Sequence, residues 1–168
     1  MKQNNGGWAS KLGNTYGVKA PAASNNRSNS GYSYGGTDNF DASYLDAGYF
    51  TDSSKTAIRP ELTSTKAKEL ANVLTNNGQV KQNQIRKFYN PIKEIADNLK
   101  FGYISYEKAL SQLREIIPIA TYSANRGNDK LTVQFADFIE TGINKIEDEK
   151  DVQAFVVHFR SIVAYTKK

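Results

Sequence analysis

Residues 79–102, QVKQNQIRKFYNPIKEIADNLKFG, carry the hydrophobic pattern that decides the fold class. Apolar residues recur in this stretch every three or four positions, at Ile85, Phe88, Ile92, Ile95 and Leu99. That spacing places them on one face of an α-helix. Gly102 follows where a helix commonly ends in a left-handed residue. The stretch therefore predicts one amphipathic helix.

Other segments between residue 60 and the C-terminus show the same spacing. One begins near Pro60 and stops at NNG, residues 76–78. Another begins at Ser105 and contains Pro118. A proline inside a helix removes a backbone hydrogen bond, so we expect this helix to be kinked or split near residues 114–117.

Two more helices are expected, one after NRGND (residues 125–129) and one from about Asp151. Residues 60–168 show no sustained alternation of apolar and polar residues, so we predict no strands there. Because the connections are short, sequential helices should be antiparallel neighbours. The sequence thus predicts an all-α fold, a compact five-helix bundle.

Residues 1–58 differ in composition from the rest. They contain eight of the twelve glycines and half of the ten tyrosines, in stretches such as SNNRSNSGYSYGGTDNF (residues 24–40). Ordering a backbone costs roughly 1–2 kcal/mol per residue, which so few aliphatic side chains would not offset. We expect residues 1–58 to be a flexible, low-complexity N-terminal extension and residues 59–168 to form the helical-bundle domain.

An alternative exists for FDASYLDAGYF, residues 40–50. Its apolar side chains could fold onto a partner surface as anchors. These are Phe40, Tyr44, Leu45, Tyr49 and Phe50.

Overall composition favours an acidic partner and a reducing compartment. Lys and Arg number 22 against 17 Asp and Glu, which gives a net charge of +5. The absence of cysteine excludes disulfides and thiolate zinc sites, so the cytoplasm is the expected location. The sequence shows neither an apolar signal segment nor a run of about 18 apolar residues that could cross a bilayer, so no membrane association is expected.

Residues suited to catalysis or metal binding are few. The single histidine, His158, lies between Val157 and Phe159, and we expect a surface or half-buried residue of the bundle. The sequence identifies no second titratable group that would make it a general acid. The acidic run IEDEKD, residues 146–151, is typical of a helix N-terminus, where carboxylates cap the helix and meet its dipole. We expect no enzymatic activity, no cofactor and no bound metal.

Basic residues follow one side of the helix in residues 79–102. Positions seven apart differ by about 20° around a helix, so Arg86, Lys93 and Lys100 form a stripe about 21 Å long. Such a stripe suits a polyanion; the alternative is a solvated helix face, partly neutralised by Glu94 and Asp97. Three side chains near the stripe could donate hydrogen bonds to phosphate or ribose oxygens. They are Gln79, Gln82 and Tyr89.

Three segments together resemble the small subunit of type III-A CRISPR effector (Csm) complexes. They are QIRKFYNPI (84–92), LREIIPIATYSANRG (113–127) and FVVHFRSIVAYTKK (155–168), in a set that covers roughly residues 64–168. The resemblance implies an all-α, non-enzymatic subunit of a prokaryotic ribonucleoprotein in antiviral defence. Its implied partners are the target RNA paired with guide RNA, the backbone and large subunits, and further copies of itself.

The resemblance also implies roles for individual residues. It places Arg86, Lys87 and Arg126 at the target-RNA surface, whereas Lys93 and Lys100 follow from helix geometry alone. Copies that stack must bury residues that are exposed in a single copy. The candidates for these contacts are Phe101, Tyr103 and Tyr165 at helix ends, and Phe40, Tyr44 and Phe50 in the extension. The alternative function is a helical protein-binding scaffold or adaptor without RNA contact.

Overall fold

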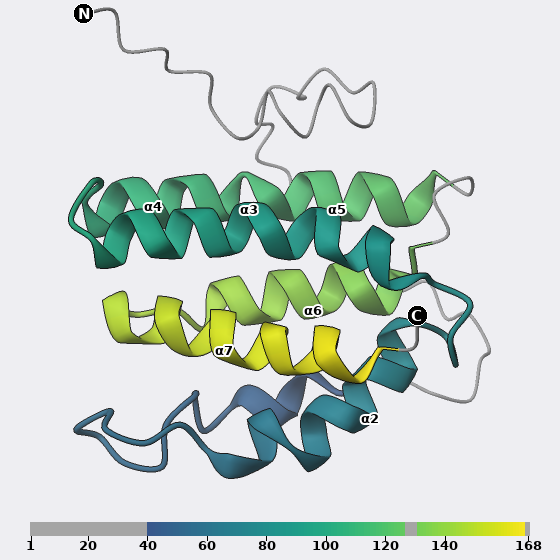
Figure 1. Ribbon diagram of the computed structural model, residues 1–168, viewed down its shortest axis with the longest axis horizontal. Coiled ribbons are helices and arrows are strands. Elements are labelled where there is room, and N and C mark those ends of the chain that lie inside the picture. The colour runs from purple at the N-terminus through teal and green to yellow at the C-terminus, as the bar shows by residue number, and fades with distance from the viewer. Residues whose placement is uncertain (1–39, 127–130, 167–168) are drawn as a thin grey trace, which may run out of the picture.

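The computed structural model describes residues 40–126 and 131–166, and these residues form helices and one isolated antiparallel bridge (Figure 1). The bridge joins Phe50 and Ile58. Two short 3₁₀ helices precede the α-helices. In chain order the elements are η1 (Ala42–Leu45), η2 (Pro60–Thr63), α2 (Thr65–Leu74), α3 (Gln82–Lys100), α4 (Tyr106–Arg114), α5 (Ile116–Asn125), α6 (Val133–Asn144) and α7 (Glu149–Tyr165).

The all-α fold class is confirmed. The third of the five expected helices is split at Glu115 into α4 and α5, within the range in which the sequence predicted a break. Pro118 lies in the first turn of α5, where its missing N–H leaves no helical hydrogen bond unmade. Pro91, in contrast, lies inside α3, which continues past it.

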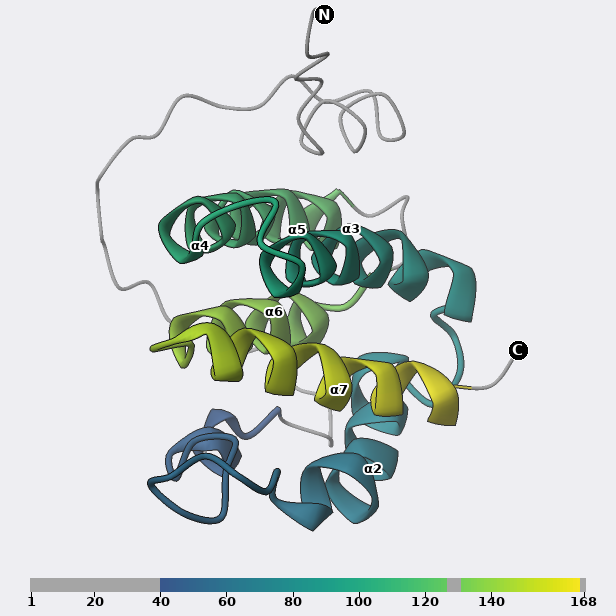
Figure 2. The same ribbon diagram turned by 60° about the vertical axis from the view of Figure 1, so that its left-hand side comes forward.

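The helices stack in three layers (Figures 1 and 2). The first contains α3, α4 and α5, the second α6 and α7, and the third α2 with residues 40–58. Within this stack α3 packs on α7, α5 on α6 and α2 on α7. Five buried phenylalanine rings from α3, α6 and α7 fill the centre, with ring centroids such as those of Phe138 and Phe159 only 5.2 Å apart. The five are Phe88, Phe135, Phe138, Phe155 and Phe159.

Residues 40–58 differ from the flexible extension that composition predicted. The side chains of Tyr44, Leu45 and Tyr49 are buried in the same hydrophobic core as the bundle helices. These side chains are few, but each packs directly into the core, which composition alone does not reveal. The folded part of the chain therefore begins before residue 58. The remainder of the expected extension, residues 1–39, lies outside the described residues.

Polar contacts from Arg59 and Lys55 hold this N-terminal segment in place. The Arg59 Nη1 donates to the carbonyl oxygens of Tyr44 (3.0 Å) and Gly48 (2.8 Å), which closes the segment on itself. The Lys55 Nζ bridges to carboxylates at the start of α7, at 2.9 Å from Asp148 and 2.7 Å from Asp151.

Candidate nucleic-acid interface

The basic residues expected at the interface lie on the exposed side of α3. Arg86, Lys87 and Lys93 are exposed, and the apolar stripe of the same helix is buried against α7 and the phenylalanine cluster. This orientation follows from the hydrophobic period, because burying the stripe turns the intervening positions outward. Burial of one face thus positions these cations.

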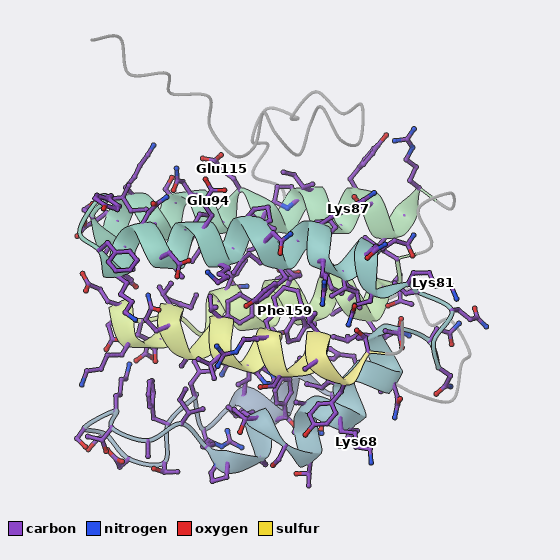
Figure 3. All side chains as sticks on the ribbon, in the orientation of Figure 1. Lys68, Lys81, Lys87, Glu94, Glu115 and Phe159 are labelled. Atoms are coloured by element: carbon purple, nitrogen blue, oxygen red, sulfur yellow. The ribbon has the colours of Figure 1, made fainter. Side chains whose placement is uncertain are left out.

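Arg86 and Lys87 point to different flanks of α3. Consecutive residues differ by about 100° around a helix, so the two side chains diverge. Lys93 lies seven residues after Arg86 and shares its flank. In Figure 3, Lys87 lies on the side of α3 away from α7, whereas Phe159 lies between the two helices. The structure therefore brings Arg86 and Lys93 together and separates Lys87 from them.

The charge of Lys93 is partly neutralised within the helix. Its Nζ forms an ion pair with Asp97 one turn later. The hydrogen bond to Asp97 and the charge of its carboxylate raise the pKa of Lys93 above its ordinary value. Both side chains remain nearly half exposed, 49% for Lys93 and 41% for Asp97, so the pair is weak and a phosphate can compete with Asp97.

The uncharged side chains near the stripe are engaged within the protein. The Gln82 Nε2 donates to the carbonyl oxygen of Val163 at 2.9 Å, which ties the start of α3 to the end of α7. The Gln79 Oε1 accepts from the Asn76 side chain, and the Tyr89 ring packs edge-to-face on Phe159. These three residues stabilise the fold in this structure, and the basic residues make up the candidate interface.

Arg126 follows the last residue of α5 and is exposed. The end of α5 and the start of α3 lie at the same end of the bundle (Figures 1 and 2), so Arg126 and Lys87 lie toward the same end of the molecule. Tyr122, one helical turn before Arg126, is also exposed. Sequence reasoning did not single out Tyr122, because the apolar pattern of α5 does not show which of its aromatic residues is buried.

The candidate subunit contacts fall into two groups. Phe101 and Tyr103 are 65% and 77% exposed at the α3–α4 turn, and Tyr165 is exposed at the end of α7, at the opposite end of the bundle (Figure 1). Phe40 and Phe50 are half-buried against the core. Tyr44 is buried, and its hydroxyl bonds to His158, so it is an intramolecular core residue that a neighbouring copy cannot reach.

His158 is fully buried, which corrects the expectation of a surface or half-buried residue. Its Nδ1 lies 2.5 Å from the carbonyl oxygen of Leu62, which can only accept, so Nδ1 carries the proton. The Nε2 lone pair then accepts from the Tyr44 hydroxyl at 3.1 Å. Burial lowers the pKa of His158 to about 4, although the hydrogen bond to Leu62 opposes the change. This neutral histidine joins α7 to the N-terminal segment and to η2.

The acidic run before α7 caps the helix, as predicted. Asp148 is the N-cap residue and accepts from the amide of Asp151, whose carboxylate in turn accepts from the amide of Asp148. α7 begins at Glu149, two residues earlier than expected. Asp151 is buried and paired with Lys55, so its carboxylate is committed to the fold. Among the described residues, no group of three or more His, Cys, Asp or Glu is arranged to hold a metal ion.

No helix in residues 40–126 or 131–166 combines the length and apolar character needed to cross a bilayer. Neither the curated proteins nor the solved structures include a match to this sequence. The family profile for Csm2, type III-A, matches residues 58–168, from just before η2 to the end of the chain. The match covers well over half of the sequence and all of α2 to α7. This chain belongs to the Csm2 type III-A family.

Proposed function

We propose that this protein is the non-catalytic small subunit of a type III-A CRISPR ribonucleoprotein complex that binds the backbone of target RNA paired with guide RNA. Family membership carries the role of small subunit in a multi-subunit Csm complex. The RNA contact rests on the exposed cations of α3, Arg86 and Lys87, with Arg126 at the same end of the bundle. Such a complex acts in antiviral defence in the cytoplasm.

Sparse basic residues are sufficient for this role. Guide and target pair by their bases, so the protein needs to hold only shape and backbone. Each copy adds a few phosphate contacts, and several copies on one RNA multiply their effect. A net charge of +5 per chain suits shared binding better than tight binding by a single copy.

End-to-end contact would place the copies along the RNA. Phe101 and Tyr103 are exposed at one end of the bundle and Tyr165 at the other. Exposed aromatic residues are favoured anchors of protein interfaces. A stack that pairs these ends leaves the exposed side of α3 open to RNA in every copy.

The test compares RNA binding by assembled complexes that carry Arg86→Ala with Arg126→Ala. We expect weaker binding, similar losses on two unrelated guide–target pairs, and unchanged assembly. Removing one phosphate contact should flatten the plot of log affinity against log salt by about 0.7 per engaged copy. Lys108→Ala, which removes one exposed charge from α4, is the control for the loss of a surface charge.

Two outcomes would count against the proposal. Unchanged RNA affinity with intact assembly would favour the protein-binding scaffold. Losses that depend strongly on the target sequence would mean that these arginines contact bases, because a backbone contact carries no base information.

A further inference from the structure

Arg160 is an exposed basic residue on α7, outside the surface of α3 and α5 described above. Gln153 lies seven residues before it, so both side chains belong to one stripe of α7. The Gln153 Nε2 donates to the carbonyl oxygen of Ala96 in α3 at 2.8 Å, which shows that this stripe borders α3. Arg160 therefore lies on the edge of α7 that faces α3.

The register between α3 and α7 determines which residues lie next to Arg160. One interhelical hydrogen bond joins Gln82 to Val163 and the other joins Gln153 to Ala96, so the helices run antiparallel. Between these two points Arg160 lies opposite the turn of α3 that holds Arg86 and Tyr89. The edge-to-face contact of Tyr89 with Phe159, at 5.4 Å between ring centroids, supports the same register.

Lys93 lies near Arg86 and Arg160 and is the third cation of this group. The charge of Arg160 acts on Lys93 and slightly opposes the increase in its pKa that Asp97 causes, as expected for two cations close together. Neighbouring helices pack about 8–10 Å apart, and Arg86 and Lys93 are separated by about 10 Å along α3. Arg86, Lys93 and Arg160 thus border one seam, and Asp97 is the carboxylate that pairs with Lys93.

We propose that this α3–α7 seam (Arg86, Lys93 and Arg160) is a continuous phosphate-binding surface and that Arg160 contacts the RNA backbone directly. The inference rests on the proposed function and extends the RNA surface from α3 onto α7. Arginine presents a planar fork of donors that matches a phosphate group, and a run of phosphates can meet several cations along one seam. Lys87 lies on the other flank of α3, and Arg126 lies at the end of α5. These two residues contact RNA separately from the seam.

Three substitutions in the assembled complex test the proposal, with a labelled single-stranded target RNA bound at several salt concentrations. Arg160→Ala should weaken binding and flatten the salt plot by about 0.7 per engaged copy. Arg160→Lys should retain most of the slope, because the charge remains. Asp97→Asn should strengthen binding, since it releases Lys93 from its ion pair.

Lys108→Ala serves as the control, and a salt slope for Arg160→Ala equal to that of this control overturns the proposal. Failure of Arg160→Ala to assemble also overturns it, and assigns the seam to a neighbouring protein subunit. If Arg86→Ala weakens RNA binding and Arg160→Ala does not, the inference fails while the proposed function stands. If neither weakens it, the proposed RNA contact of this flank fails as well.

Discussion

Replacing Tyr49 with phenylalanine removes one hydroxyl group, and we expect the change to destabilise the whole bundle. Tyr49 is 1% exposed, and its hydroxyl donates to the carbonyl oxygen of Gly142 at 2.7 Å. This carbonyl lies in the last turn of α6, where the helix offers no further amide to bond it. Without the hydroxyl, the carbonyl is a buried acceptor without a donor, which costs about 1–3 kcal/mol.

The destabilisation should be visible by thermal and urea denaturation followed by far-UV circular dichroism. In a chain of this size each kcal/mol lowers the Tm by about 2–4 °C, so Tyr49→Phe should lower it by roughly 2–12 °C. The urea midpoint should fall while the slope of the transition stays the same. Tyr103→Phe is the matched control, because that side chain is 77% exposed and a surface change of this kind alters stability by about 0.5 kcal/mol or less.

Equal midpoints for Tyr49→Phe and Tyr103→Phe would refute this reasoning. A second result would refute it differently: an unchanged midpoint together with faster proteolysis within residues 50–58. That result would mean that the N-terminal segment opens by itself and does not belong to the cooperative unit.

Three further predictions concern stability and association. The folded state lowers the pKa of His158 from about 6.5 to about 4, so the unfolded state binds its proton more readily. The stability that depends on this residue is present above about pH 6.5 and falls as the pH drops toward 4. Urea midpoints at several pH values should show this fall, and His158→Gln should reduce it between pH 6.5 and 4. Gly142→Ala places a Cβ against the buried ring of Phe155 and should lower the free energy of unfolding by about 1–3 kcal/mol, measured by urea denaturation. Phe101→Ala with Tyr103→Ala should leave the Tm unchanged and weaken self-association in sedimentation experiments, because both rings are exposed; a lowered Tm would contradict their assignment as subunit contacts.

The hydrophobic period was sufficient to predict the helices, but proline alone did not locate the breaks. Pro118 marks the split between α4 and α5, as expected. Pro91 lies inside α3 without ending it, although a proline within a helix costs roughly 3 kcal/mol. α3 buries apolar residues on both sides of Pro91, among them Phe88 and Ile92. Tertiary packing outweighs the local preference there.

The N-terminal segment shows where composition misleads. Averaged over residues 1–58, aliphatic residues are too few to predict folding. Yet Tyr44 and Tyr49 supply large rings as well as hydroxyls that reach polar atoms inside the protein, His158 Nε2 and the Gly142 carbonyl. The alternative expectation from the sequence was that these aromatic residues bind the surface of a partner. In the structure they pack on the helical bundle of their own chain.

The basic surface was predictable only in part. That Arg86 and Lys87 are exposed follows from the apolar stripe of their own helix. Their division between two flanks also follows from helix geometry. The register of α3 against α7 determines whether the Gln82 side chain is available to bind RNA. It also determines which cations of other helices lie beside α3. Two side-chain hydrogen bonds join the helices in that register, and such bonds leave no periodic signal in the sequence.

The N-terminal segment and the basic surface belong to different parts of the molecule. The family profile begins at residue 58, whereas the folded core begins near residue 44, so part of the core of this chain precedes the family region. The buried tyrosines of that segment bond to Gly142 in α6 and to His158 on the inner side of α7, whereas Arg86 is an exposed cation of α3. Energetic effects at sites without shared partners are usually additive. Tyr49→Phe and Arg86→Ala should therefore combine without coupling: the double variant should have the melting temperature of the first and the RNA affinity of the second. A coupling above about 0.5 kcal/mol would mean that the N-terminal segment and the RNA surface are linked through α7.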